Sequence, residues 1–120
     1  MAKTALIVFA GTEGHADLGR VFNALETARE YKQDGDADDV TLIFDGAGTE
    51  WIPELEDPEH DAHEVYASVK DVIEGACRFC AKSFGVFQQI EQTDVPFLSD
   101  FEGHPSIKSL VDEGYEVITF

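Results

Sequence analysis

The stretch TALIVFAG, residues 4–11, decides the fold of this 120-residue chain. Residues 4–10 form one apolar run, partly β-branched, that ends at Gly11. Because no polar residue alternates with the apolar ones, the run indicates a strand buried on both faces of a parallel sheet. A second such run, VTLIF at residues 40–44, follows a segment with helical spacing. The chain thus opens β-α-β, which predicts an α/β fold with parallel strands and a right-handed crossover.

The segment between these two runs predicts an amphipathic helix that ends near Lys32. Asp17 can cap this helix, and the apolar residues after it recur at helical spacing. These residues are Leu18, Val21, Phe22, Leu25 and Ala28. The stretch DGDADD at residues 34–39 is the expected turn into the second strand.

The rest of the chain predicts further alternation of helices and strands. An irregular stretch from Trp51 to Pro58 is expected to precede a helix from about His60 to Asp71. Residues 73–76 should form a short strand that delivers Cys77 to a helix ending near Gly85. The last expected elements are a strand or extended loop within 95–101, a helix within 104–114 with Ile107, Leu110 and Val111 facing inward, and a strand at 115–120.

These elements fit a single domain covering residues 1–120. A chain of this length can bury a continuous core and is too short for two comfortable domains. Neither an internal repeat nor a linker interrupts the sequence. We therefore predict a three-layer α/β sandwich with a mainly parallel sheet of about four to five strands and helices on both faces.

The composition is strongly acidic, with 25 acidic and 8 basic residues and a net charge of −17. Nucleic acid and anionic membranes are therefore not expected as partners, because both would be repelled. The hydrophobic content of 43% indicates a folded chain. Acidic residues spread along the whole sequence are typical of a protein from a high-salt cytoplasm, where salt screens self-repulsion. The first apolar run is too short for a secretory signal, so a cytoplasmic protein is expected.

The stretch GACRFCAKSFGV, residues 75–86, contains both cysteines. A C-x-x-C pair in a reducing compartment is more typical of redox or metal chemistry than of a structural disulfide. We expect Cys77 to be the nucleophile, because a helix N-terminus and the nearby Arg78 and Lys82 would lower its pKa. Cys80, one turn later, would be the resolving thiol. The alternative is that both cations pair with surface carboxylates while the cysteines pack as small apolar residues.

A metal site is the weaker interpretation of the same pair. Cys77 and Cys80 could be completed by His60 and His63, or by His104. One C-x-x-C pair with scattered histidines is a weak zinc signal, and a domain with its own core needs no zinc to fold. We therefore expect no metal and no other cofactor.

Two glycine-containing loops are expected at the carboxyl ends of strands, where open parallel sheets bind ligands. Neither GTEGH at 11–15 nor DGAGTEW at 45–51 matches a nucleotide-binding motif, and their acidic residues disfavour phosphate. Both loops are instead expected to shape a cleft beside the cysteines. The cleft-lining candidates are Gly11, Thr12, His15, Asp45, Gly46, Gly48 and Trp51.

With these residues in view, the chain resembles the DsrE/DsrF-like family of small sulfur-metabolism proteins. The resemblance rests on the opening strand and helix, on a strand that ends in IFDGAG at 43–48, and on a late cysteine before a short helix ending in Gly-Val. In CRFCAKSFGV, Cys77 matches the sulfur-accepting cysteine of the family's relay members, ahead of Gly85 and Val86. Cys80 departs from that pattern. The acidic composition suits a haloarchaeal-type member of the family.

The resemblance implies a compact three-layer domain that associates into trimers or hexamers. It also implies a persulfide that forms on Cys77 and passes from a sulfur-donor protein to an acceptor. We therefore expect a persulfide carrier or relay protein of intracellular sulfur metabolism, similar to a sulfurtransferase. Two alternatives stay open: a thiol-disulfide switch formed by Cys77 and Cys80, and a non-catalytic oligomeric module that binds a small ligand.

Overall fold

The computed structural model describes residues 3–34 and 39–120, and its centre is a parallel β-sheet. In that part of the chain five strands pair in the order β4-β3-β2-β1-β5. All four strand pairs are parallel, as the two apolar runs predicted. The strands are β1 (Lys3–Val8), β2 (Val40–Phe44), β3 (Ile73–Cys77), β4 (Phe97–Leu98) and β5 (Tyr115–Thr119).

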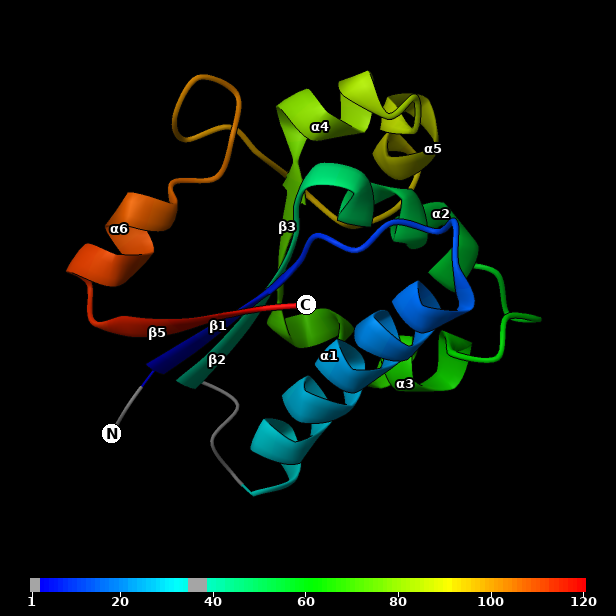
Figure 1. Cartoon of the computed structure of the whole chain (residues 1–120), viewed down its shortest axis with the longest axis horizontal. Coiled ribbons are helices and arrows are strands. Elements are labelled where there is room, and N and C mark those ends of the chain that lie inside the picture. Colours follow the sequence, from blue (N-terminus) through cyan, green and yellow to red (C-terminus); the bar gives the residue numbers. More distant parts are fainter. Residues whose placement is uncertain (1–2, 35–38) are drawn as a thin grey trace.

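Helices cover both faces of this sheet. Figure 1 shows α1, α2 and α3 on one side and α6 on the other, which confirms the predicted α/β sandwich. The α-helices are α1 (His15–Gln33), α2 (Trp51–Leu55), α3 (His63–Ser68), α4 (Arg78–Ser83), α5 (Phe87–Glu91) and α6 (Ile107–Asp112). Two short 3-10 helices, η2 (Gly46–Glu50) and η3 (Lys70–Val72), follow β2 and precede β3. None of the helices described is long and apolar enough to cross a membrane.

The main hydrophobic core lies between the sheet and α1. Leu6 and Val8 of β1 and Leu42 and Phe44 of β2 point to this side, and all four are fully buried. Ile7 of β1, which points to the opposite face, is fully buried as well. The part of the apolar run that lies in β1 is therefore the doubly buried strand that was predicted, but the strand ends at Val8 and Phe9 is 40% exposed.

Several helix boundaries differ from the prediction. Residues 51–55 are helical rather than irregular. Pro53 lies in the first turn of α2, where backbone N–H groups form no hydrogen bond within the helix, so the N–H that proline lacks is not needed there. The predicted helix from His60 begins only at His63. Its start is delayed because the Ala62 N–H donates to Nδ1 of His60, which holds residues 60–62 in a turn. Residues 35–38 of the turn predicted at 34–39 lie outside the described residues.

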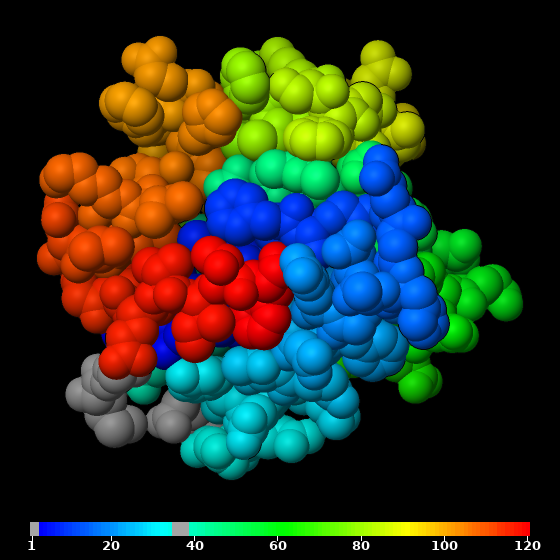
Figure 2. All heavy atoms as spheres, viewed as in Figure 1, coloured from blue at the N-terminus to red at the C-terminus, as the bar shows by residue number. Residues whose placement is uncertain are grey.

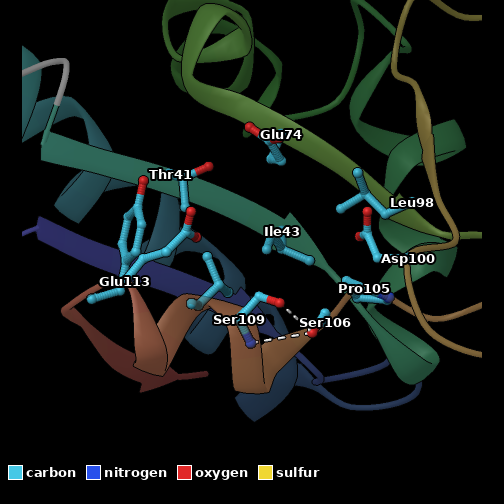
Figure 3. Close-up of a pocket in the computed structure, with 11 residues that line it drawn as sticks. Thr41, Ile43, Glu74, Leu98, Asp100, Pro105, Ser106, Ser109 and Glu113 are labelled. Atoms are coloured by element: carbon cyan, nitrogen blue, oxygen red, sulfur yellow. Dashed lines mark hydrogen bonds between the residues drawn. The ribbon is translucent and has the colours of Figure 1, made fainter.

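The prediction that Ile107, Leu110 and Val111 of α6 all face inward was wrong for two of the three residues. Val111 is 57% exposed and Ile107 is 36% exposed, whereas Leu110 points toward the sheet. The reason is that α6 packs beside the edge strand β5, so only one side of the helix meets the sheet. A hollow of about 320 Å³ remains between α6 and the sheet, lined by Thr41, Ile43 and Glu74 among others (Figure 3).

Candidate functional site

Three neighbouring strands deliver the cysteines and two further reactive side chains to one place. Asp45 follows β2, Cys77 ends β3, and His104 lies in the loop after β4. Cys80 is in the first turn of α4. Because these strands are parallel and adjacent, their carboxyl ends lie at the same edge of the sheet. One side-chain donor atom from each of the four residues lies within 4.8 Å of the others.

Gly75 lets β4 approach β3 closely enough to close this site. A Cβ at this position would lie 2.6 Å from the carbonyl oxygen of Pro96 and 2.8 Å from Cγ of Leu98, so no larger residue fits. The Ala76 N–H donates to the same Pro96 oxygen at 2.9 Å. This contact brings the chain after β4 over the end of β3, where Cys77 lies.

A tight turn then presents His104 to the thiols. Glu102 and Gly103 have φ values of 50° and 84°, and Phe101 and His104 exchange both backbone hydrogen bonds across them, at 2.9 and 2.8 Å. A two-residue turn with positive φ at both positions favours glycine. The Phe79 N–H donates to the Gly103 oxygen at 2.9 Å, which ties the turn to α4. Figure 2 shows these two segments side by side at one edge of the molecule.

The side chains at the site are held by specific contacts. Sγ of Cys77 accepts a hydrogen bond from the Cys80 N–H at 3.3 Å, so Cys77 caps α4. Nδ1 of His104 lies 3.3 Å from Sγ of Cys77 and 4.0 Å from Sγ of Cys80. The Cys80 thiol donates to Oδ1 of Asp45 at 3.5 Å, and the same oxygen accepts from the Gly46 N–H at 2.8 Å. The four residues thus form one hydrogen-bonded cluster, which we call the thiol cluster.

The two thiols differ in exposure. Cys77 is fully buried, and Cys80 is partly exposed. Burial is the largest cause that raises the pKa of Cys77 to about 12, followed by the hydrogen bond with the Cys80 thiol, while the Cys80 N–H acts in the opposite direction. The prediction of a lowered pKa for Cys77 was therefore wrong in sign. A partly exposed thiol is the easier one for an external reagent to reach, which favours Cys80 as the attacking group.

Arg78 and Lys82, which were predicted to lower the pKa of the thiols, lie against the Phe87 ring instead. The guanidinium of Arg78 is 5.5 Å from the centre of the Phe87 ring, and Nζ of Lys82 is 5.0 Å from the same centre. Both side chains therefore extend along α4 toward α5. Because α4 has only six residues, its dipole is also a weak source of positive potential.

The predicted cleft-lining residues separate into two groups. Asp45 belongs to the thiol cluster, and the Gly46 N–H donates a hydrogen bond to the Asp45 carboxylate. Trp51 does not line a cleft: its side chain is buried, and its Nε1–H donates to the Ala10 oxygen at 2.9 Å. Gly48 packs against the Val8 carbonyl. The remaining candidates, Gly11, Thr12 and His15, lie before or at the start of α1 and contribute no atom to the thiol cluster.

His104 is the only one of the three histidines considered as metal ligands that reaches the thiols. Nδ1 of His60 accepts from the Ala62 N–H, and Nδ1 of His63 lies 2.7 Å from the Leu55 oxygen. From the sequence, His104 was considered only as one possible metal ligand beside the cysteines, and Asp45 only as a residue that lines the cleft. Neither was predicted to form a hydrogen bond with a thiol, as both do in the structure. The Glu-Gly turn before His104 was the available signal, because it indicates a tight turn directly after a strand.

Comparisons with known proteins add one distant relative. The chain is 28% identical over 117 residues to an uncharacterized protein of Methanocaldococcus jannaschii, an alignment that covers 97% of this chain and 93% of the relative. No protein-family model matches the sequence. No solved structure matches it either.

Proposed function

We propose that this protein carries sulfane sulfur on its paired thiols, with Cys80 as the acceptor and Cys77 as the resolving thiol. The observation that carries the proposal is the contact of both sulfurs with one imidazole nitrogen, at 3.3 Å for Cys77 and 4.0 Å for Cys80. An imidazole can take a proton from a thiol and return it near neutral pH. Burial decides the order of the two thiols, because only Cys80 is open to solvent.

The first step transfers one sulfur atom. The thiol proton of Cys80 passes to Nδ1 of His104, and the thiolate attacks the outer sulfur of a donor persulfide. A bond forms between Sγ of Cys80 and that sulfur, the S–S bond of the donor breaks, and the donor leaves as a thiol after it takes up a proton. Cys80 is then a persulfide, and an acceptor thiol can remove its outer sulfur by the reverse reaction.

The adjacent Cys77 provides a second exit for the sulfur. Because Cys77 is protonated at rest, its thiol proton must first pass to Nδ1 of His104, 3.3 Å away, after that nitrogen has given up the proton it took from Cys80. The Cys77 thiolate then attacks Sγ of Cys80, the bond to the outer sulfur breaks, and hydrosulfide leaves. The two cysteines become a disulfide, so two electrons have moved to the released sulfur. An external dithiol must then reduce the disulfide before another cycle.

Sulfur uptake by three matched proteins tests this assignment. Reduced wild type, Cys77→Ser and Cys80→Ser are exposed to inorganic polysulfide in molar KCl and analysed by mass spectrometry. Serine at position 77 keeps a side-chain oxygen that can cap α4. We expect Cys77→Ser to hold one added sulfur, wild type to release sulfide and form a disulfide, and Cys80→Ser to gain almost none.

Three outcomes would contradict the proposal. Sulfur uptake by Cys80→Ser at the rate of Cys77→Ser would make the buried thiol the acceptor. A wild type that forms a disulfide with a general oxidant, while Cys77→Ser retains no sulfur, would favour the thiol-disulfide switch. If no protein reacts, the cysteines have a packing role.

A further inference from the structure

The thiol cluster also has the composition of a transition-metal site. It contains two thiol sulfurs, one imidazole nitrogen and one carboxylate oxygen, contributed by Cys77, Cys80, His104 and Asp45. These are the ligand types that zinc takes in proteins, and a C-x-x-C pair is a common way to supply two of them. Four donors also match the usual coordination number of zinc in structural sites.

The distances between the donor atoms come close to those of a tetrahedron around one ion: two of them match it, and all donor atoms lie within 4.8 Å of one another. With Zn–S bonds of about 2.3 Å and Zn–N or Zn–O bonds of about 2.0 Å, neighbouring ligand atoms in a tetrahedral site lie about 3.3 to 3.8 Å apart. In the thiol cluster the separation is 3.3 Å for Cys77 Sγ to His104 Nδ1 and 3.5 Å for Cys80 Sγ to Asp45 Oδ1. Cys80 Sγ to His104 Nδ1 is 4.0 Å. Small side-chain movements would bring the donors onto one ion.

Among the described residues, the carboxylate of Asp45 forms no ion pair with a lysine or arginine. Asp45 is only 6% exposed. Buried carboxylates are normally paired with a cation or bind a metal. A divalent ion in the thiol cluster would supply the missing positive charge.

Neighbouring contacts orient the donors before any ion binds. The Gly46 N–H holds Asp45, and the Cys80 N–H points at Sγ of Cys77. The His104 ring packs against Phe79 with ring centres 4.7 Å apart. Such outer contacts fix the orientation of metal ligands and support affinity. Cys80 and His104 are partly exposed, so an ion can enter from their side.

We propose that the reduced protein binds one zinc ion through Asp45, Cys77, Cys80 and His104. Binding exchanges the two thiol protons for the metal. The proposal goes beyond sulfur transfer and does not require it, because zinc binding needs only reduced thiols.

Cobalt provides a direct spectroscopic probe of this site. Reduced protein is titrated with Co²⁺ in molar KCl without any sulfur donor, and Zn²⁺ is then added. We expect one Co²⁺ per chain with the absorption of tetrahedral thiolate coordination, bleached by one equivalent of Zn²⁺. The site should be lost in the Cys77→Ser/Cys80→Ser double variant, which also measures cation binding by the acidic surface.

Single substitutions test the other two ligands. His104→Ala should weaken Zn²⁺ binding by about tenfold or more, since even outer contacts of metal ligands are worth that much. Asp45→Asn should weaken binding in the same direction. His15→Ala is the matched control, because His15 is exposed and outside the thiol cluster, and it should leave Zn²⁺ affinity unchanged.

A measurement on wild type alone tests zinc binding even if the substituted proteins fail to fold. Zn²⁺ should protect both thiols from alkylation, and a chelator should restore their reactivity. The proposal is overturned if reduced wild type gives no thiolate-to-cobalt absorption, if Zn²⁺ fails to protect the thiols, or if His104→Ala binds like wild type. Sulfur uptake is measured separately with chelator present, so either proposal can fail while the other stands.

Discussion

Lys70 connects two carboxylates that are far apart in the sequence. Its Nζ lies 2.8 Å from Oε2 of Glu56 and 2.5 Å from Oδ1 of Asp94. The hydrogen bond and charge of Lys70 lower the pKa of Asp94. Burial opposes the charged form of Lys70, but its hydrogen bonds to Asp94 and Glu56 outweigh this, so the pKa of Lys70 is raised. The ion pairs are therefore complete at neutral pH.

This arrangement predicts a pH-dependent cost for Lys70→Gln. A carboxyl group whose pKa is lowered by folding stabilises the protein above its unfolded pKa of about 3.9, and this contribution is lost as pH falls through the lower folded value. We expect the variant to melt below wild type at pH 7 and the gap to shrink in acid. Thermal unfolding of both proteins in molar KCl between pH 7 and pH 3 measures this gap. A gap that stays constant would mean that Lys70 acts through packing alone.

At the scale of single residues, the sequence identified the cysteines but not their environment. The C-x-x-C spacing indicated that both sulfurs would meet at the start of a helix, and they do. Cys77 is buried and Cys80 is partly exposed. His104, which is more than twenty residues further along the chain, reaches Cys77 because β4 pairs with β3. The sign of the Cys77 pKa shift follows from that long-range packing, and local charges in the sequence do not reveal it.

Among the larger elements, η2 depends on Gly48. A Cβ at this position would lie 2.0 Å from the Val8 oxygen, so η2 could not remain against the end of β1. We expect Gly48→Ala to destabilise the protein by a few kcal/mol, about the size of other severe steric changes in a core. Because η2 begins directly after Asp45, the same variant should also slow sulfur uptake at Cys80.

Gly19→Ala is the matched control for this prediction. Gly19 lies within α1, and no atom lies within 4 Å of the position that a Cβ would take there. Alanine at this position should therefore be neutral or stabilise the protein by up to about 1 kcal/mol. Unfolding by denaturant in molar KCl compares the two variants with wild type. If Gly48→Ala proves as stable as Gly19→Ala, the close packing of η2 on β1 would be refuted.

The predictability of each element follows its length and its periodicity. The buried strands β1 and β2 and the long helix α1 were predicted because their patterns extend over many residues. α2 and α5 have five residues each and were not predicted. Helices this short depend on packing against the core, in which Ile52 and Ile90 are fully buried, and not on local propensity. The contacts that stabilise them are between elements, so no local window of sequence contains them.

For the whole molecule, charge is the dominant feature. The net charge of −17 is carried by a chain whose radius of gyration is only 13.3 Å. At 0.1 M salt the Debye length is about 10 Å, similar to this radius, so carboxylates across the surface repel one another. At 1 M it is about 3 Å, and only adjacent charges interact. Salt should therefore stabilise the folded state, which concentrates the charge more than the unfolded chain does.

This argument predicts that the melting temperature rises between 0.1 and 1 M KCl and that surface charge sets the size of the rise. The triple variant Glu13→Gln/Glu91→Gln/Glu116→Gln removes three exposed carboxylates. It should melt above wild type at 0.1 M KCl, because less repulsion remains, and its melting temperature should rise less with added salt. Thermal unfolding of both proteins across the KCl series measures how strongly the melting temperature of each depends on salt. Equal salt dependence in the two proteins would assign the stabilisation to stronger apolar burial in concentrated salt, since that effect is indifferent to the number of surface carboxylates.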